Sequence, residues 1–556
     1  MSELAKGRNS FERGDWRDAY SLLSRANETS TLGAADLERL GMSAYLIGLD
    51  REFHRFVEHA HRSYVEDGRA ERAARSAFTL ALDLFLSGET GKATGWLNRA
   101  RRLIEGRHCV EHGYLDLPLA ERQLSAGDPQ AAHETASGIH EIGVSFGDVD
   151  LISASLHLQG RALIAQGRVE AGLALLDEAM LEVVEGNVSP IFTGLIYCSV
   201  IEACREVYAL GRAHEWTNEL TRWCDGQPDL IRFTGACYVD RAEIMRLQGD
   251  WLEAMSEADR ACRRSSQSGD PAPPAEAYYQ VAELHRLRGQ FEEAEDAYRH
   301  ASRIGFVPQP GLALLRLAQN QGSSASSMIQ RALHEATRPL ERAKLLPACV
   351  EIRLAAGDLE QGRMACRELE EIADRFDTGV LRAISMHARG AVELAEGDPE
   401  TALVSLRRAS EEWKAPYEVA RIRELTGWAC LKLDDEEGAG LEFDAARAVY
   451  EKLGAEPDLA RLSAVGKRQP EGGVSVEERK QKTLDESMDS ERPNVLTPRE
   501  FEVLHRVAAG KTNKEIASEL FLSERTIDRH VSSILTKFDV PSRAAATAYA
   551  YEHKIL

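Results

Sequence analysis

A short turn motif recurs along most of the chain and restricts it to very few folds. A glycine, often followed by aspartate, comes after an apolar helix end, and a small residue follows about five places later. Clear copies begin at Gly14, Gly88, Gly127, Gly167, Gly249, Gly289, Gly357 and Gly397, and weaker copies begin at Gly48, Gly211, Gly322 and Asp434. The copies recur about every 38 residues, a period typical of helical solenoids.

Each part of the motif has a physical interpretation. The glycine ends a helix in the left-handed conformation, where other side chains clash. The aspartate caps the next helix by accepting a hydrogen bond from a backbone N–H, and the small residue lets two helices approach closely. The segments between the motifs have helical spacing, and no segment alternates with a period of two. We therefore predict an all-α fold with about 12 helix pairs over residues 1–465.

The copy GQFEEAEDAYRHA at 289–301 is similar to a tetratricopeptide (TPR) repeat. The residues at the family's positions are Gly289, Phe291, Ala294, Tyr298 and Ala301. The resemblance covers roughly residues 5–465 and implies a right-handed TPR-like solenoid, whose concave groove would receive a protein, peptide or small-molecule effector. The alternative is a compact all-helical body without a ligand groove.

Charge and cysteine content restrict where such a chain can act. The net charge is -22, so most of the surface would repel nucleic acid and anionic lipid. No stretch of 18 apolar residues occurs, and the nine cysteines are scattered without a C-x-x-C motif. We expect a cytoplasmic protein with reduced thiols, no membrane association, and DNA binding confined to a small module of different charge.

Several local patterns suggest enzymatic or metal chemistry but are incomplete. The segment GETGKAT at 88–94 is not a phosphate-binding loop, because Leu86 replaces its first glycine and Ala93 replaces its hydroxyl residue. His108, Cys109 and His112 have helical spacing for zinc but no convincing fourth ligand. We expect no enzyme activity, no metal and no cofactor.

The composition changes sharply after the repeats. Residues 466–493 contain six basic and seven acidic side chains and almost no large apolar ones, which predicts a flexible linker. Residues 494–556 contain nine Lys/Arg and eight Asp/Glu, a net charge of +1, so the rest of the chain carries -23. The C-terminal module therefore lacks the acidic excess of the body.

This module has dense helix-capping signals. Thr497 with Glu500 and Thr512 with Glu515 form capping boxes, and Ser523 caps a third helix. Two capped helices joined by a short turn predict a helix-turn-helix. On the third helix the apolar positions are Ile527, Val531, Ile534, Leu535 and Phe538, and the polar positions are Arg525, Asp528, Arg529, Ser532 and Thr536. The polar stripe would fit the major groove, where arginine reaches guanine.

The same module closely resembles the LuxR-type helix-turn-helix. The matching segments are LTPREFEVL (496–504), NKEIASEL (513–520), LSERTIDRHVSSILTKF (522–538) and SRAAATAYA (542–550). The resemblance implies a four-helix domain that binds double-stranded DNA as a homodimer, usually through its last helix. By position, Lys514, Ser523, Thr526 and Lys537 would hold phosphates, and Asp528, Arg529 and Ser532 would face base edges. His530 also stands where the family has histidine.

The set of residues expected to bind DNA is wider than these positions. It comprises Thr512, Asn513, Lys514, Ser523, Arg525, Thr526, Asp528, Arg529, Ser532 and Lys537. Thr512 stands at a helix start, where backbone N–H groups bind phosphate. Asp528 has two interpretations, because its carboxylate could accept from a cytosine N4 group or orient Arg525 or Arg529.

The functional hypothesis is a sequence-specific transcriptional regulator. In it the solenoid senses a partner, and the C-terminal domain binds DNA and works with RNA polymerase. The alternative is a protein-interaction scaffold in which the helix-turn-helix is secondary, or autoinhibited through shielding by the acidic body.

Overall fold

The described structure is entirely α-helical. The computed structural model describes residues 2–227, 229–267 and 275–466, and in the C-terminal part residues 496, 498–508, 511–520, 522–538, 540 and 543–552. Within these ranges no strand occurs, which agrees with the predicted fold class. Apart from residue 466, the predicted linker lies outside the described residues. The chain divides into two compact units, residues 1–425 with 446–459 and residues 426–445 with 460–556.

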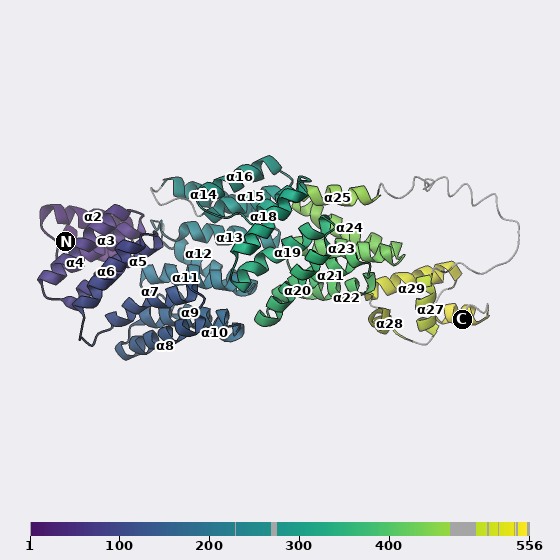
Figure 1. Cartoon of the computed structure of the whole chain (residues 1–556), viewed down its shortest axis with the longest axis horizontal. Helices are drawn as coiled ribbons and strands as arrows, with labels where there is room; N and C mark the ends of the chain where they lie inside the picture. Colours follow the sequence, from purple (N-terminus) through teal and green to yellow (C-terminus); the bar gives the residue numbers. More distant parts are fainter. Residues whose placement is uncertain are drawn as a thin grey trace. The chain divides into compact units, whose positions relative to one another are not determined.

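The body is a succession of helix pairs (Figure 1). The first six are α1 Glu3–Glu12 and α2 Trp16–Thr29, α3 Ala34–Leu46 and α4 Asp50–Glu66, α5 Ala70–Leu86 and α6 Thr90–Leu103, α7 Glu111–Ser125 and α8 Pro129–Phe146, α9 Val149–Ala165 and α10 Val169–Val184, α11 Pro190–Glu206 and α12 Leu210–Asp225. The next six are α13 Thr234–Gln248 and α14 Trp251–Gln267, α15 Ala275–Leu287 and α16 Phe291–Arg303, α17 Gly311–Ala318 and α18 Gly322–Glu335, α19 Pro339–Ala355 and α20 Leu359–Phe376, α21 Gly379–Glu396 and α22 Pro399–Glu412, α23 Pro416–Lys432 and α24 Glu436–Leu453. Helix α25 Glu456–Gly466 follows them.

The turn inside each pair contains a residue with positive φ. The eight clear motif glycines and Gly48 have φ values from 75° to 90°, and Asp434 has 59°, so these motif positions are confirmed. The prediction is wrong at Gly211 and Gly322, which lie within α12 and at the start of α18. There the left-handed residues are Tyr208, at 59°, and Asn320, at 60°. The body imposes the turn at these positions even though no glycine is present to relieve the strain.

Once these two turn positions are corrected, the small residue of the motif falls at the same place in almost every helix pair. Five positions after the left-handed residue, eleven of the twelve pairs have alanine or glycine, and α4 has the buried Phe53. These small residues are Ala19, Ala93, Ala132, Gly172, Ala213, Ala254, Ala294, Ala325, Gly362, Ala402 and Ala439. At Gly172 on α10 the two helices are very close, because an added Cβ would lie 2.5 Å from the Gly160 carbonyl oxygen of α9.

Segments far apart in sequence also pack together within the body. The connecting hydrogen bonds are Trp16 Nε1 to Gln227 Oε1 at 2.8 Å, Ile231 N to Leu46 O at 2.9 Å, and Thr378 Oγ1 to Val207 O at 2.7 Å. The first and last of these join residues 211 and 171 positions apart. The repeat array therefore contacts itself after about five repeats, whereas the right-handed sense of its superhelix stays a prediction.

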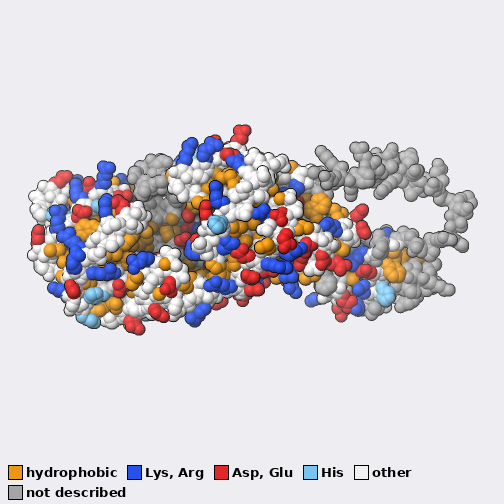
Figure 2. Space-filling model, viewed as in Figure 1, with side chains coloured by type: hydrophobic (Ala, Val, Ile, Leu, Met, Phe, Trp, Pro, Cys, Tyr) orange, Lys and Arg blue, Asp and Glu red, His pale blue; other side chains and the backbone are white. Residues whose placement is uncertain are grey.

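The visible surface of the body mixes charges of both signs. Figure 2 shows Lys and Arg interspersed with Asp and Glu rather than gathered into a broad basic patch. Among the described helices, none has the length and apolar character that crossing a bilayer requires. The described side chains also contain no group of three or more His, Cys, Asp or Glu placed to hold a metal.

Candidate nucleic-acid interface

The C-terminal domain packs four short helices around one apolar core. They are α27 Pro498–Ala508, α28 Asn513–Leu520, α29 Glu524–Phe538 and α30 Arg543–Glu552. The buried core side chains are Val503, Leu504, Val507, Ile516, Ala517, Leu520, Ile527, Val531, Ile534, Phe538, Ala546 and Ala550. Because α29 contributes four of them, its core-facing side is fixed by burial of apolar surface.

Side-chain caps set where α28 and α29 begin. Thr512 N donates to Glu515 Oε2 at 2.7 Å, and Glu515 N donates to Thr512 Oγ1 at 3.3 Å, which confirms this capping box. Thr526 N donates to Ser523 Oγ at 3.0 Å, which confirms the cap of α29. Thr497, of the other predicted capping box, lies outside the described residues. Both confirmed caps leave further backbone N–H groups at the helix starts, where a phosphate can bind.

The two predicted faces of α29 are separated as expected. Ile527 is fully buried and Val531 is 8% exposed, whereas Leu535 is partly buried against the core. On the opposite side Asp528, Arg529 and Ser532 are exposed. The side chains of Arg525 and Thr536 lie outside the described part of the helix. The polar edge of α29 is therefore accessible while its apolar side forms the core.

The expected phosphate-binding residues, apart from Lys537, lie at the starts of these helices. Thr512 and Lys514 are exposed at the start of α28, and Ser523 is exposed before α29. Thr526 is half-buried, and its hydroxyl lies 2.7 Å from that of Ser523. Within the described residues Lys514 makes no ion pair, so its ammonium group is available to an anion.

Asn513 joins three helices. Its amide nitrogen donates to the Asp528 carboxylate, and its amide oxygen accepts from Arg543 at the start of α30. Arg543 also donates to the Lys511 carbonyl oxygen at 2.7 Å. The Asp528 carboxylate thus accepts a hydrogen bond from Asn513, a contact that the sequence did not predict. The sequence analysis assigned no role to Arg543. Its place at the start of a predicted helix was the one sequence feature that could have drawn attention to it.

Lys537 pairs with a buried carboxylate. Its ammonium group lies 2.6 Å from Glu500 Oε2, and Ser533 Oγ donates to Glu500 Oε1 at 2.7 Å. Glu500 is 3% exposed, so its carboxylate requires these partners. The sequence placed Glu500 in a capping box, and the contact with α29 was not predicted. His530, on the same helix, is also buried.

The acidic side chains near α28 have positively charged or hydrogen-bonding partners. Glu519 is ion-paired to Lys511 and, at 3.3 Å, to Arg506, and the hydrogen bond from Lys511 lowers the pKa of its carboxyl. The backbone and hydroxyl hydrogen bonds from Thr512 lower the pKa of Glu515. Compensated carboxylates repel a phosphate backbone less than isolated ones do.

Comparisons with known proteins agree with this geometry. Residues 494–550 match the family model described as bacterial regulatory proteins, luxR family. The transcriptional regulatory protein LiaR of Bacillus subtilis is 46% identical over 61 residues, which are 11% of this chain and 29% of that protein. The nitrate/nitrite response regulator protein homolog of Haemophilus influenzae is 28% identical over 207 residues, which are 34% of this chain and 91% of that protein. Residues 494–550 therefore form a LuxR-type helix-turn-helix domain.

The chain is also similar to a solved repeat protein. The crystal structure of a tetratricopeptide repeat protein from Parabacteroides merdae has a TM-score of 0.31 and 15% identity, and the match covers 50% of this chain and 98% of that one. The TPR-like solenoid of the body is established by its own helix pairs, left-handed turns and buried small residues.

Proposed function

We propose that the chain is a sequence-specific transcriptional regulator that binds double-stranded DNA as a homodimer in the bacterial cytoplasm and acts on RNA polymerase. The observation that carries the proposal is the exposed polar edge of α29 in a domain of the LuxR type. An α-helix with such an edge fits the major groove, and a dimer reads two half-sites.

The expected DNA-binding residues have different roles according to their position in the domain. Lys514, Ser523 and Thr526, with Thr512, contact phosphates at the helix starts. Arg525, Asp528, Arg529 and Ser532 face base edges, and Asn513 holds the Asp528 carboxylate in place. The resemblance assigns Lys537 to a phosphate. In this proposal Lys537 instead keeps its contact with Glu500 of α27 and so stabilises the packing of α29 on α27.

The body receives the regulatory signal in this proposal. A cavity of about 730 Å³ lies where the α11–α12 turn meets residues 377–382 and 412–415. Its apolar side chains include Leu173, Leu247 and Trp413, and its rim includes Arg212 and Arg382. The volume and the mixed lining suit a drug-sized molecule or the side chains of a bound peptide.

DNA binding by the full chain tests the first part. An operator is selected from a random-sequence duplex library with the wild-type chain, and binding is titrated at several salt concentrations. Arg529→Ala is expected to cost about 1–3 kcal/mol on the selected site and to relax its sequence preference. Lys514→Ala is expected to weaken binding to all sequences and to reduce the log–log salt slope by about 0.9.

A lysine on the body provides the matched control. Lys92 is exposed and ion-paired to Glu89, so Lys92→Ala removes the same charge away from the domain. Its operator binding should equal that of wild type. If Arg529→Ala and Lys514→Ala bind as Lys92→Ala does, α29 is not the recognition helix.

The scaffold alternative makes a different prediction. Residues 490–556 and the full chain are compared on the same duplex. Equal affinity excludes shielding of the domain by the body, and tighter binding by 490–556 supports it. Loss of binding in both leaves the scaffold function.

A further inference from the structure

Cys224 and Cys237 lie side by side at the junction of two helices. Cys224 is in the last turn of α12, and Cys237 is in the first turn of α13. Both side chains line one cavity of about 230 Å³. Neither cysteine is in a disulfide, so the two form a dithiol.

The two sulfur atoms are not equivalent. The hydrogen bond from Cys224 lowers the pKa of the Cys237 thiol, against the opposing effect of burial, and Thr221 and Arg241 lower it further. Thr221 Oγ1 lies 3.7 Å from Cys237 Sγ. The same contact between the sulfurs raises the pKa of Cys224, as burial also does. The groups beside Cys237, Thr221 and Arg241, therefore favour its thiolate, the nucleophilic form of a cysteine.

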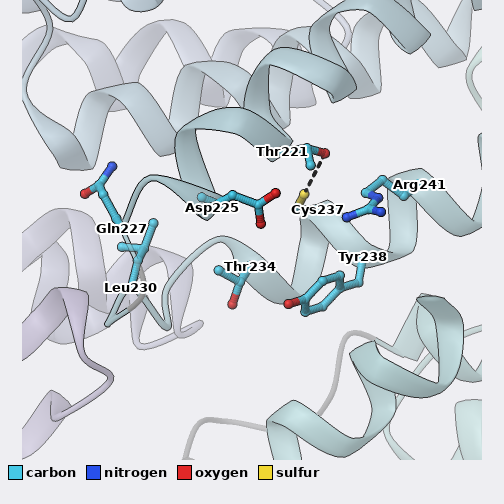
Figure 3. Close-up of a pocket in the computed structure, with 9 residues that line it drawn as sticks. Thr221, Asp225, Gln227, Leu230, Thr234, Cys237, Tyr238 and Arg241 are labelled. Carbon is cyan, nitrogen blue, oxygen red and sulfur yellow. Dashed lines mark hydrogen bonds between the residues drawn. The ribbon is translucent and has the colours of Figure 1, made fainter. Parts of the chain in front are cut away.

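The charged groups around the two cysteines have opposite effects on the ionisation of the thiols. Arg241 favours the thiolate of Cys237, whereas Asp240 disfavours it, and Asp225 and Cys198 further disfavour ionisation of Cys224. In the view of Figure 3, the Asp225 carboxylate and the Arg241 guanidinium lie on either side of the Cys237 sulfur. This asymmetry separates the roles of the two thiols.

The cavity gives a small oxidant access to the pair. It is lined mainly by polar side chains, among them Thr234, Tyr238 and Arg241 (Figure 3). A molecule of hydrogen peroxide is little larger than water, which occupies about 30 Å³ in the liquid. Cys237 itself is 2% exposed, so larger oxidants and bulky thiols are excluded from its sulfur.

We propose that Cys224 and Cys237 are an oxidative modification site that a hydroperoxide converts to a reversible disulfide. The Cys237 thiolate attacks one peroxide oxygen, the O–O bond breaks, and the departing hydroxide takes a proton to become water. Cys237 is then a sulfenic acid. The Cys224 sulfur attacks it, the S–O bond breaks, and the leaving hydroxide takes the Cys224 proton. Two thiols are oxidised and one peroxide is reduced to two water molecules.

The site lies at the base of a loop that joins distant parts of the body. Between the two cysteines, residues 226–233 connect α12 to α13, and Pro228 lies outside the described residues. This loop holds the early repeats through Ile231 N to Leu46 O, at 2.9 Å, and through the ion pair of Arg232 with Asp50. A disulfide at its base would restrain the loop, and reduction by a dithiol would release it.

The test is hydrogen peroxide treatment of the full chain. Free thiols are then alkylated, and the protein is digested without reductant for mass spectrometry. The expected product is a peptide pair joined through Cys224 and Cys237, which dithiothreitol reverses. Cys204→Ser is the matched control, because burial raises the pKa of that thiol to about 12 and its loss should leave the product unchanged. A disulfide between Cys198 and Cys237, or no disulfide, overturns the proposal.

Single variants test the assigned roles without needing the disulfide. In Cys224→Ser, peroxide should leave a sulfenic acid on Cys237, which dimedone captures when it is added together with denaturant. In Cys237→Ser, Cys224 should be oxidised at least about tenfold more slowly than Cys237 in the first variant. If Cys237 in Cys224→Ser reacts no faster than Cys204 in the same protein, the proposed activation of Cys237 is wrong. Neither readout requires DNA binding.

Discussion

The body and the C-terminal domain are both helical, but they use charged side chains in opposite ways. In the body, buried carboxylates accept hydrogen bonds from neighbouring helices: Ser405 Oγ donates to Glu393 Oε2 at 2.7 Å, and Tyr450 OH donates to Glu424 Oε2 at 3.0 Å. In the domain, Lys514 and Arg529 are exposed, and Arg529 also pairs with Glu437 of α24 at 2.9 Å. Polar groups of the body hold repeats together in its interior, whereas those of the domain edge lie at the surface.

This difference in the use of charged side chains follows from the partners that each region provides for them. A repeat array of net charge -22 stays folded because its interior acids have donors, and burying them unpaired would be costly. A DNA-binding edge needs charges whose partners are phosphates and bases. The comparison predicts that substitutions of buried charges in the body change stability, and that substitutions on the domain edge change binding.

The largest loss of stability is expected from substitution of Arg232. Its side chain is 16% exposed, pairs with Asp50 and, at 3.4 Å, with Asp83, and lies over the Tyr45 ring. Arg232→Ala leaves the 6%-exposed Asp83 side chain without this partner, and we expect the free energy of unfolding to fall by about 4 kcal/mol. Urea denaturation of the full chain measures it.

Arg17 is the control for Arg232 within the same long-range contact. It pairs with Asp229 at 3.2 Å, but its side chain is 64% exposed. Arg17→Ala should cost less than about 1 kcal/mol. Equal losses for the two variants would show that burial does not decide the strength of these contacts.

The next effect tests the close approach of helices in the body. Gly172→Ala places a Cβ 2.5 Å from the Gly160 carbonyl oxygen, so α9 and α10 must separate, and we expect a loss of about 3 kcal/mol. Gly211→Ala is the same substitution in a helix with no atom within 4 Å of the new Cβ. It should raise stability by about 0.5–1 kcal/mol. Thermal denaturation that ranks the variants in the reverse order would contradict the proposed packing.

A smaller effect concerns pH. Burial, followed by the charge of Arg161, lowers the pKa of His157 from 6.5 to about 4, while its Nε2 lies 2.7 Å from Ser199 Oγ. Between pH 6.5 and about 4, the His157 side chain therefore binds a proton in the unfolded chain but stays neutral in the folded chain. The contribution of neutral His157 is complete above pH 6.5 and is lost as the pH falls from 6.5 toward 4, by about 2 kcal/mol at pH 5.

The measurement compares urea midpoints at pH 7 and pH 5. His157→Gln removes the titrating group, so the difference between the two midpoints should shrink. His505, exposed on α27 of the domain, is the control, and His505→Gln should keep the wild-type difference. An unchanged difference in His157→Gln would assign the acid sensitivity to other groups.

The sequence predicted the repeat architecture better than its irregular turns. Ten of the twelve turn positions follow from glycine and aspartate, because the left-handed conformation restricts residue choice. Tyr208 and Asn320 could not be found in this way, since packing imposes their conformation against local preference. Contacts such as Thr378 with Val207 depend on how the repeats stack, which no local pattern encodes.

In the domain, the prediction succeeded for elements set by local rules. The caps at Thr512 and Ser523 and the burial of Ile527 follow from residue spacing along one helix. The contacts of Asn513 with Asp528 and of Glu500 with Lys537 join different helices, so spacing alone did not reveal them. The assignment of Lys537 to a phosphate rests on the resemblance to the LuxR-type domain and stays a prediction.

The smallest effect separates the two lysines of the domain. Lys537→Ala removes the ammonium partner of the Glu500 carboxylate, whose side chain is 4% exposed, and we expect about 1 kcal/mol less stability. Amide hydrogen exchange along α29 in the full chain should then quicken about fivefold. Lys514→Ala, at an exposed site, should leave exchange unchanged and weaken DNA binding. If Lys537→Ala leaves exchange unchanged and lowers the salt slope of DNA binding as Lys514→Ala does, Lys537 is a phosphate ligand, and the contrast between supporting and accessible charges fails within the domain itself.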